Sequence, residues 1–357
     1  MACLADLEEL ARARLPGDVW DFLAGGSGAE TTLNGNRAAL DRLSVVPRVL
    51  AGVAQVSTRA PVLGRPSDLP VAVAPMAYQH LAHPDGEPAL ARAAARAGVS
   101  YAASTLSSRP IEEITATGAT VWFQLYWLRD RDLVAGLLDR AEAAGCTAVV
   151  LTADVPILGR RLRDLRNSFA LPTDVVAANL RAGPTDRAHT VLAGTSAVAA
   201  HTRAAFAPGL AWRDVAWLRA RTRLPLVVKG ILDPRDAVRA VEAGADAVVV
   251  SNHGGRQFDA APPSIVALPP VVDAVAGRCE ILLDSGIRSG TDVLRALALG
   301  ASAVLVGRPL LWALAVGGGP GAAAALSLLG AELRDALTLA GCADPAAARD
   351  LRTVTVD

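Results

Sequence analysis

Residues 224–256, with the sequence LPLVVKGILDPRDAVRAVEAGADAVVVSNHGGR, contain one complete strand–helix–strand unit. The apolar runs at 226–229 and 247–251 have the length of buried strands. The charged, alanine-containing segment 234–243 between them has the pattern of an amphipathic helix. Gly244 directly follows this segment, as a helix-terminating glycine does. The stretch therefore predicts two parallel strands joined by a helix.

The same unit recurs along the rest of the chain. Apolar runs predict eight strands, at residues 71–74, 100–104, 120–125, 148–152, 226–229, 247–251, 281–284 and 303–306. Helix candidates lie at residues 87–97, 130–144, 234–243 and 291–298, with a C-terminal pair around 320–340. Eight parallel strands, each followed by a helix, predict a closed (β/α)8 TIM barrel in the α/β class. A doubly wound open sheet is the alternative architecture.

Two segments fall outside the repeated units. Residues 1–65 contain helix candidates at 5–15 and 19–23, which predict a helical cap on one end of a single barrel domain over residues 66–357. The connection after the fourth strand, residues 159–209, is rich in Ala, Thr and Arg and shows no strand pattern. We expect it to form a long loop that acts as a lid or is partly disordered.

The composition argues against several classes of protein. The 357 residues include 35 basic and 35 acidic side chains, so no net charge attracts nucleic acid or an anionic membrane. The four cysteines are far apart in sequence, which favours free thiols over disulfides or a metal site. The N-terminus lacks the apolar core of a secretory signal, and no segment is expected to have the length of a membrane span. These features predict a cytoplasmic protein.

Glycine and arginine follow the last two predicted strands. The segments concerned are Asp284-Ser285-Gly286-Ile287-Arg288 and Gly307-Arg308. Barrels commonly bind a phosphate here, through backbone N–H groups and a helix N-terminus. A cation near a helix start is unfavourable unless an anion offsets it. Arg288 and Arg308 therefore favour a phosphorylated cofactor, and two solvated side chains are the alternative.

Reactive groups follow the fourth, fifth and sixth predicted strands. His253 is followed by two glycines, which let the backbone approach a ligand, and it is a candidate general base. A histidine bound only to main-chain groups is the alternative. Asp154 is the carboxylate that would stabilise the protonated imidazole. Lys229 would pair either with a cofactor that becomes anionic on reduction or with a neighbouring carboxylate.

Two arginines and the end of the third strand complete the candidate pocket. Arg161 and Arg256 have the fork geometry that binds a carboxylate, and together they predict an anionic substrate, although either alone is more often a surface residue. Tyr126 would hydrogen-bond a substrate hydroxyl and Gln124 a planar heterocycle. Ordinary packing at the barrel rim is the alternative for these two side chains.

These segments resemble the FMN-dependent 2-hydroxy acid oxidases and dehydrogenases, a family that includes glycolate oxidase, lactate oxidase and mandelate dehydrogenase. The similarity covers nearly the whole chain, and its most specific motif is Ser251-Asn252-His253-Gly254-Gly255-Arg256-Gln257. The resemblance implies FMN as the cofactor and an (S)-2-hydroxy acid as the substrate. It also implies a homo-oligomer, a tetramer.

The resemblance assigns a role to each candidate residue. FMN would contact Pro75, Met76, Ala77, Ser104, Gln124, Thr152, Lys229 and Ser251, with its phosphate at Asp284, Ser285, Gly286, Ile287, Arg288, Gly307 and Arg308. Lys229 would stabilise the reduced cofactor. Arg161 and Arg256 would hold the substrate carboxylate, and Tyr126 its hydroxyl. His253 would accept a proton, with Asp154 supporting its charge.

Three residues depart from the usual pattern of the family. Phe22 stands where the family has a carboxylate-binding tyrosine, Leu106 where glycolate oxidase has a tryptophan, and Met76 where threonine is common. Phe22 and Leu106 imply a larger and more apolar substrate pocket. Such a pocket favours an aryl substrate, mandelate or 4-hydroxymandelate, and long-chain aliphatic 2-hydroxy acids are the alternative.

Two features bear on the electron acceptor. Residues 170–207 are interrupted by charged side chains, unlike the apolar insertion of the membrane-bound mandelate dehydrogenases. Ala77, where those dehydrogenases tend to have glycine, resembles the oxidases, and both features favour O2 as acceptor with H2O2 as product. A dehydrogenase with another acceptor is the alternative. An FMN-dependent isomerase barrel and a non-catalytic phosphate-binding barrel are further alternatives, but neither needs His253, Arg161 and Arg256.

Overall fold

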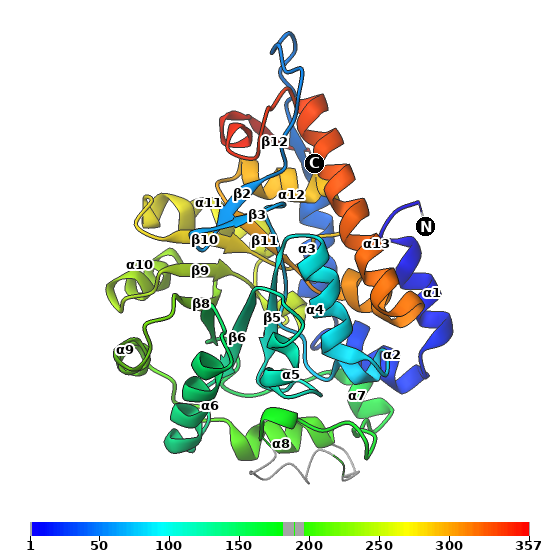
Figure 1. Ribbon diagram of the computed structural model, residues 1–357, viewed down its shortest axis with the longest axis vertical. Coiled ribbons are helices and arrows are strands. Elements are labelled where there is room, and N and C mark those ends of the chain that lie inside the picture. Colours follow the sequence, from blue (N-terminus) through cyan, green and yellow to red (C-terminus); the bar gives the residue numbers. More distant parts are fainter. Residues whose placement is uncertain (1, 181–188, 190–195, 357) are drawn as a thin grey trace.

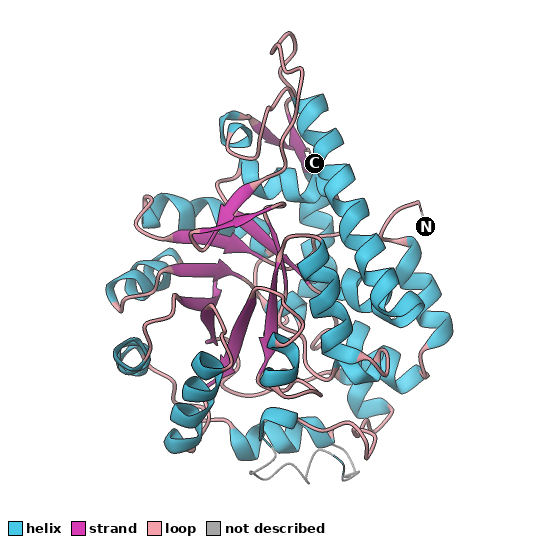
Figure 2. Cartoon of the chain, viewed as in Figure 1, coloured by secondary structure: helices cyan, strands magenta, loops and turns pink. Residues whose placement is uncertain are grey.

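The computed structural model describes residues 2–180, 189 and 196–356, and it contains a closed barrel of eight parallel strands. The strands follow one another around the barrel in the order β10-β11-β4-β5-β6-β7-β8-β9. Helices surround them on the outside (Figures 1 and 2). The predicted TIM barrel is therefore confirmed, and the open doubly wound sheet is wrong, because β11 pairs with β4 and closes the sheet.

The barrel strands lie where the apolar runs predict them. Their bounds are β4 (Val71–Val73), β5 (Ser100–Ser104), β6 (Val121–Tyr126), β7 (Ala148–Thr152), β8 (Leu226–Ile231), β9 (Ala247–Val250), β10 (Glu280–Leu283) and β11 (Ala303–Val306). Both faces of these strands are buried, since one faces the barrel interior and the other faces the helices. This burial explains why the strands appear in the sequence as continuous apolar runs rather than as alternating patterns.

A short antiparallel hairpin closes the N-terminal end of the barrel. It consists of β2 (Ala60–Val62) and β3 (Arg65–Ser67). Val62 packs against the side chains that fill the barrel interior. The Glu280 carboxylate, at the start of β10, accepts the N–H groups of Leu63 at 2.8 Å and Gly64 at 3.2 Å. The expected boundary between cap and barrel, after residue 65, falls inside this hairpin.

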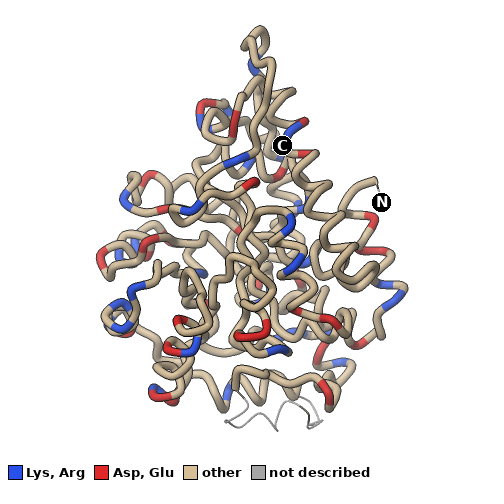
Figure 3. Tube along the Cα trace, in the orientation of Figure 1, with Lys and Arg blue, Asp and Glu red and all other residues tan. Residues whose placement is uncertain are grey.

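The outer layer consists mainly of the helices that follow the barrel strands. They are α4 (Gly86–Arg96), α5 (Ile111–Thr115), α6 (Arg131–Ala143), α9 (Trp212–Arg221), α10 (Pro234–Glu242), α11 (Ser264–Val275), α12 (Gly290–Ala298) and α13 (Arg308–Ala340). A further pair of strands, β1 (Leu43–Val45) and β12 (Thr353–Thr355), joins the segment after α3 to the C-terminal end of the chain. Basic and acidic residues are dispersed along the whole trace rather than gathered in one part of it (Figure 3).

The last helix differs from the sequence-based expectation. With 33 residues, α13 is long and apolar enough to cross a membrane, which contradicts the expectation that no segment reaches this length. However, the backbone of α13 is not helical at Gly317 and Gly318, so the element consists of two helices joined at a kink. The predicted C-terminal pair is therefore only partly right, because its first helix lies before residue 317 and the predicted range 320–340 lies in the second helix. The two parts pack against α1, α4 and α12, and this packing accounts for the buried apolar side chains of α13.

The N-terminal segment covers the opposite, C-terminal end of the barrel. It contains α1 (Asp6–Arg14), α2 (Gly17–Ala24) and α3 (Thr31–Arg42). Asn36 of α3 exchanges two side-chain hydrogen bonds with Asn252, which follows β9, at 3.0 and 2.7 Å. A Cβ on Gly255 would lie 2.5 Å from the Leu33 backbone, so only glycine permits this close approach of α3. The predicted helical cap thus reaches the strand ends that carry the candidate catalytic residues.

The long connection after β7 is more ordered than the sequence suggests. Residues 159–209 contain α7 (Leu162–Arg166), the 3-10 helix η2 (Ala178–Leu180) and α8 (Ala197–Ala205). The expectation of a structureless loop is therefore wrong for these parts. Helix α7 has only five residues and α8 is rich in alanine, so neither carries enough large apolar side chains to show a clear helical period. The expectation of a lid or of disorder at residues 181–188 and 190–195 lies outside the described residues.

Candidate active site

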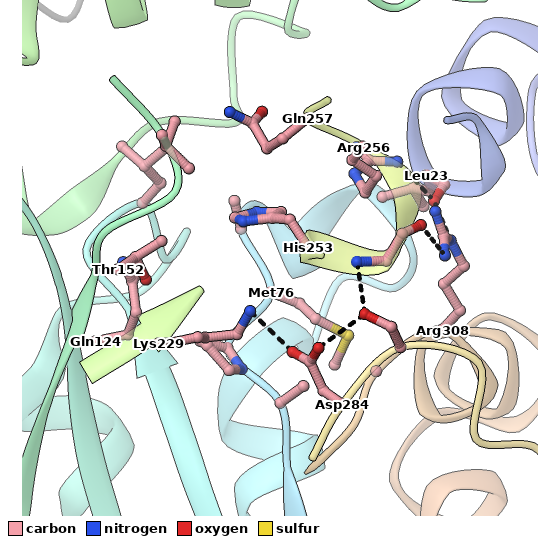
Figure 4. Close-up of a pocket in the computed structure, with 18 of the residues that line it drawn as sticks. Leu23, Met76, Gln124, Thr152, Lys229, His253, Arg256, Gln257, Asp284 and Arg308 are labelled. Atoms are coloured by element: carbon pink, nitrogen blue, oxygen red, sulfur yellow. Dashed lines mark hydrogen bonds and ion pairs between the residues drawn. The ribbon is translucent and has the colours of Figure 1, made fainter. Parts of the chain in front are cut away.

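The C-terminal ends of the barrel strands surround one pocket, which is shown in Figure 4. Most of the predicted site residues line it: Phe22, Pro75, Met76, Ala77, Leu106, Gln124, Tyr126, Thr152, Arg161, Lys229, His253, Arg256, Asp284, Ser285, Gly286, Ile287, Arg288, Gly307 and Arg308. The remaining three, Ser104, Asp154 and Ser251, lie directly behind it and hydrogen-bond to lining side chains. Segments that are up to 286 residues apart in sequence thus form a single site.

His253 is held in position by both its backbone and its ring. Its φ of 58° is in the left-handed region, which is uncommon for a non-glycine residue. The Ser251 hydroxyl accepts the His253 N–H at 3.0 Å and helps to hold this conformation. The ring Nδ1 lies 3.0 Å from Oδ1 of Asp154. His253 is therefore paired with a carboxylate rather than with main-chain groups alone.

The electrostatics of this pair suit a proton acceptor. Burial lowers the pKa of His253, and Asp154 offsets only part of that effect. Burial raises the pKa of Asp154, but His253 and Lys229 together bring it below its ordinary value. The histidine is thus neutral at neutral pH while the aspartate is ionised. Because an ionised carboxylate only accepts hydrogen bonds, Nδ1 carries the proton and Nε2 is free to accept one.

Two further residues fix Asp154, and sequence reasoning gave neither of them this role. The Gln257 amide donates to the main-chain carbonyls of Asp154 at 2.9 Å and Ile157 at 2.8 Å, and its oxygen accepts the Gly159 N–H at 3.0 Å. Gly230 has a φ of 106°, and a Cβ there would lie 2.6 Å from the Asp154 side chain. Gly230 therefore leaves room for the carboxylate. In the sequence, the only sign of this role is a glycine directly after the predicted strand at 226–229.

Lys229 is buried and pairs with a carboxylate. Its Nζ lies 2.8 Å from Oδ2 of Asp284 (Figure 4). The same Nζ donates to the Ser251 hydroxyl at 2.7 Å. Burial lowers the pKa of Lys229, but Asp284 and Asp154 raise it above its ordinary value, so the ammonium group is charged. The structure thus shows the structural ion pair that the sequence left open. It places the same ammonium group in the wall of the pocket, where it can also face a cofactor.

The side chains from β6 and its neighbours form an oriented polar wall. The Gln124 amide nitrogen donates to the Thr152 hydroxyl at 2.9 Å, and its oxygen accepts the Ser104 hydroxyl at 3.1 Å. Ser104 therefore acts on the pocket through Gln124. The Tyr126 ring stacks on Phe206, which follows α8, with ring centroids 4.6 Å apart. The rim packing that the sequence left open is thus present, and Tyr126 lines the pocket as well.

The two predicted carboxylate-binding arginines differ in their contacts. The Arg161 guanidinium is buried, and its Nε has no hydrogen-bond partner in the part of the chain that the structure describes. Arg256 donates to the main-chain carbonyls of Phe22 at 2.8 Å, Leu23 at 3.2 Å and Gly25 at 2.6 Å, all at the C-terminal end of α2. Burial lowers the pKa of both arginines. Arg161 is buried and Arg256 is partly buried, and neither forms an ion pair with a carboxylate among the described residues, which fits an anionic ligand.

Phe22 supports both arginines from the cap. Its ring centroid lies 5.7 Å from the guanidinium carbon of Arg161 and 5.6 Å from that of Arg256. The ring also stacks on Phe169, with centroids 4.4 Å apart. An aromatic ring at this distance attracts cations through its π face. Phe22 therefore contributes to the anion site by positioning, without the hydroxyl donor of a tyrosine.

The segments after β10 and β11 form a second cationic region. Burial, and next to it Arg288, lowers the pKa of the Arg308 guanidinium to about 9. Burial likewise lowers the pKa of Arg288. Arg308 donates to the carbonyls of Leu23, Gly25 and Gly254 at 3.1–3.3 Å, and no carboxylate pairs with it among the described residues. Because arginine stays charged in proteins, two neighbouring guanidinium groups of this kind suit an anionic ligand.

The comparison with known proteins identifies the family. Residues 11–353 match the family model described as FMN-dependent dehydrogenase. The chain belongs to this family. A 4-hydroxymandelate oxidase from Amycolatopsis orientalis is 58% identical over 350 residues, which cover 98% of this chain and 97% of that protein. An L-lactate oxidase from a Nostoc species is 48% identical, with 95% and 94% covered.

Solved structures agree with the family assignment. A crystal structure of mandelate oxidase with (S)-4-hydroxymandelic acid is similar to this FMN-dependent dehydrogenase family member with a TM-score of 0.97. Its sequence is 57% identical, and 99% of each chain is covered. FMN is therefore the cofactor, as the sequence predicts, and the protein is an FMN-dependent oxidoreductase. The isomerase and non-catalytic alternatives are wrong.

The residues of the pocket fit FMN. At one end, Arg288 and Arg308 are partly buried cations that form no ion pair with a carboxylate among the described residues, which suits the phosphate. Lys229 and the oriented amide of Gln124 provide polar groups in the middle of the pocket, which suit the edge of a planar heterocycle. The Asp284 carboxylate pairs with Lys229 instead of facing the arginines, an arrangement that keeps negative charge away from the phosphate.

We expect Arg308→Met to weaken FMN binding by about 30- to 100-fold, because charge-assisted hydrogen bonds contribute about 2–3 kcal/mol. The dissociation constant of FMN is measured by the quenching of its fluorescence on titration with apoprotein. Arg92→Met, at an exposed arginine of α4, is the matched control and should leave this constant unchanged. Equal affinities in wild type and Arg308→Met would place the phosphate elsewhere.

Proposed function

We propose that the protein oxidises (S)-2-hydroxy acids with an aryl group, such as mandelate or 4-hydroxymandelate, to 2-oxo acids. The observation that carries this proposal is the His253–Asp154 pair, which faces the same pocket as the unpaired Arg161 guanidinium. An acid that binds there has its carboxylate next to the anion site. Its HO–C–H group then lies next to the neutral base. This is the arrangement that oxidation of a 2-hydroxy acid requires.

Each residue of the site has a separate role in this reaction. Arg161 and Arg256 bind the substrate carboxylate, and the Tyr126 hydroxyl binds the 2-hydroxyl group. Nε2 of His253 accepts a proton released from the HO–C–H group, and the Asp154 carboxylate stabilises the resulting imidazolium. FMN, when bound, takes up the two electrons of the C–H bond. Lys229 contributes positive charge beside the cofactor as it is reduced.

The aryl substrate is supported by the walls of the pocket. Leu106, Leu158, Val198 and Phe206 line it, and Phe22 adds an aromatic ring from the cap. Each apolar group that a substrate buries against such a wall contributes favourably to the free energy of substrate binding. Two relatives are named for mandelate or 4-hydroxymandelate. The L-lactate oxidase relative makes aliphatic 2-hydroxy acids the second candidate.

We further propose that O2 is the electron acceptor, so that one 2-hydroxy acid and one O2 give one 2-oxo acid and one H2O2. The names of the relatives, which are oxidases, support this choice over a dehydrogenase with another acceptor. A cytoplasmic homo-oligomer, a tetramer, remains our proposal for the state of the protein. Light scattering of the purified protein tests the tetramer, which a monomeric mass would contradict.

One experiment tests the activity. The purified protein, with FMN bound, is mixed anaerobically with (S)-mandelate, and its visible spectrum is recorded before and after air is admitted. We expect the flavin absorbance near 450 nm to disappear and then to return with release of H2O2. Bleaching that air does not reverse would support the dehydrogenase. A spectrum that neither (S)-mandelate nor (S)-4-hydroxymandelate changes would overturn the proposed function.

A further inference from the structure

Glu87 carries a buried carboxyl group that has no role in the chemistry described above. It lies in the first turn of α4, and its side chain is 0% exposed. Burial raises the pKa of Glu87. An apolar side chain usually costs less free energy at such a position than an acidic one. A buried acid on a helix of the outer layer therefore indicates a specific partner.

One oxygen atom of Glu87 joins two loops at the C-terminal end of the barrel. Oε1 accepts the backbone N–H of Gln79 at 3.1 Å and that of Ser108 at 2.7 Å. Gln79 begins the 3-10 helix η1 (Gln79–Leu81) in the loop after β4, and Ser108 belongs to the loop after β5. Both residues are buried, so their N–H groups depend on the carboxyl group as acceptor.

Further hydrogen bonds hold the same two loops together. The Tyr78 N–H donates to the Leu106 carbonyl at 3.0 Å, and the His80 N–H donates to the Ser108 hydroxyl at 3.2 Å. Glu87 differs from these groups because it belongs to neither loop. The helix α4, which carries it, also packs on η1. Glu87 therefore fixes the joined loops relative to the outer layer of the barrel.

The two loops form different parts of the pocket wall. The loop after β4 contributes Pro75, Met76 and Ala77, which we expect to contact the flavin. The loop after β5 contributes Leu106, which belongs to the apolar wall assigned to the aryl group. Glu87 binds each loop two residues beyond Ala77 and Leu106, respectively. Loss of its oxygen therefore affects the spacing between the flavin-facing loop and this apolar wall.

We propose that Glu87 is a positioning residue, which sets the distance between the flavin-facing loop and Leu106 and so adapts the pocket to an aryl substrate. This inference rests on the proposed function. Glu87 is not one of the described residues that line the pocket, and it takes no part in proton transfer. Without its oxygen, two buried N–H groups lose their acceptor, and the loops move to hydrate them. An aryl ring then loses packing against Leu106, whereas a methyl group loses little.

The test compares (S)-mandelate with (S)-lactate in wild type, Glu87→Leu and Glu87→Gln, each with FMN bound. Leucine has a similar size but accepts no hydrogen bond, whereas glutamine retains an oxygen acceptor. In Glu87→Leu, we expect kcat/KM to fall about tenfold more for mandelate than for lactate. The backbone N–H groups of residues 79 and 108 should also exchange with solvent deuterium faster. Glu87→Gln should keep the wild-type substrate ratio and the slow exchange.

Glu280→Leu is the matched control, because the Glu280 carboxylate also accepts two backbone N–H groups, at the opposite end of the barrel. This variant should keep the wild-type ratio between the substrates. Glu87→Asp is a second test variant, since its shorter side chain withdraws the carboxyl group from both N–H groups. It should change the substrate ratio in the same direction by a smaller factor, and it decides the question if Glu87→Leu does not bind FMN.

Three results would overturn the inference. The first is an equal change of kcat/KM for both substrates in Glu87→Leu or, where that variant does not bind FMN, in Glu87→Asp. The second is the same ratio change in Glu280→Leu. The third is a ratio change in Glu87→Gln as large as in Glu87→Leu, which would assign the effect to the acid rather than to its acceptor oxygen. Failure of the proposed function is a separate outcome, because wild type would then oxidise no aryl 2-hydroxy acid.

Discussion

Replacing His253 by alanine is expected to slow reduction of the bound flavin by substrate by about 10²–10⁴-fold, the usual contribution of a general base. The neutral imidazole, 3.0 Å from Asp154, is the group placed to accept the proton. The variant should still bind FMN, because its phosphate site lies at Arg288 and Arg308. The rate is measured by anaerobic stopped-flow absorbance with (S)-mandelate.

The control for this variant is another histidine that carries no assigned role. His83 lies near Asp85 at the surface, with Nδ1 and Oδ2 3.7 Å apart. His83→Ala should reduce at the wild-type rate. Flavin reduction at full speed in His253→Ala, with FMN still bound, would remove His253 from the role of base and leave the substrate-binding arginines as the main source of catalysis.

The same base predicts the pH dependence of flavin reduction. The His253 pKa lies below its ordinary value of 6.5, and only the neutral ring accepts a proton. The rate should therefore be constant around pH 7 and fall as the pH drops through this lowered pKa. Asp154→Asn removes an interaction that raises the pKa of His253, so the fall should move to still lower pH while the plateau rate decreases. A fall that begins above pH 7 would contradict this assignment.

Replacing Arg161 by methionine is expected to lower kcat/KM by about 10²–10³-fold. The substrate carboxylate would lose its partner inside a buried site, and loss of one member of a buried charge pair costs about 2–5 kcal/mol. Arg161 is a cleaner test than Arg256, because Arg256 also donates to three carbonyls of the cap. Steady-state kinetics with (S)-mandelate measure the effect.

Two variants separate the charge of Arg161 from general disturbance of the site. Arg160→Met removes the exposed neighbouring arginine and should leave kcat/KM unchanged. Arg161→Lys keeps the charge but not the two parallel N–H donors, so its kcat/KM should lie between those of wild type and Arg161→Met. Wild-type kinetics in Arg161→Met would show that the carboxylate binds elsewhere in the pocket.

The barrel and the position of its site were predictable from the sequence because both depend on local patterns. Each strand is an apolar run of four to six residues, apart from β4 with three, and parallel strands bring their C-terminal ends to one side of the barrel. Polar residues directly after these runs, such as His253 and Asp154, therefore meet in space. Topology alone brings them together, although 98 residues separate them in the sequence.

Other parts of the site depend on contacts that a sequence pattern does not contain. The partner of Lys229 is Asp284, on a strand end that is two positions away around the barrel. The contacts of Arg256 with α2 depend on how the cap docks. Helix α8 escaped detection because five of its nine residues are alanine and Val198 is its one large apolar side chain. These features depend on tertiary packing, and the local periodicity of apolar residues does not predict such packing.

Two backbone carbonyl oxygens at the end of α2 contact arginines of both the substrate site and the phosphate site. The carbonyls of Leu23 and Gly25 each accept from Arg256 and from Arg308, at 2.6–3.3 Å. Arg256 belongs to the substrate site and Arg308 to the phosphate site, so one turn of backbone fixes the distance between them. A shift of this turn changes both sites together. We therefore expect cofactor and substrate binding to be coupled, and by reciprocity a bound 2-hydroxy acid changes the affinity for FMN by the same factor as FMN changes the affinity for the acid.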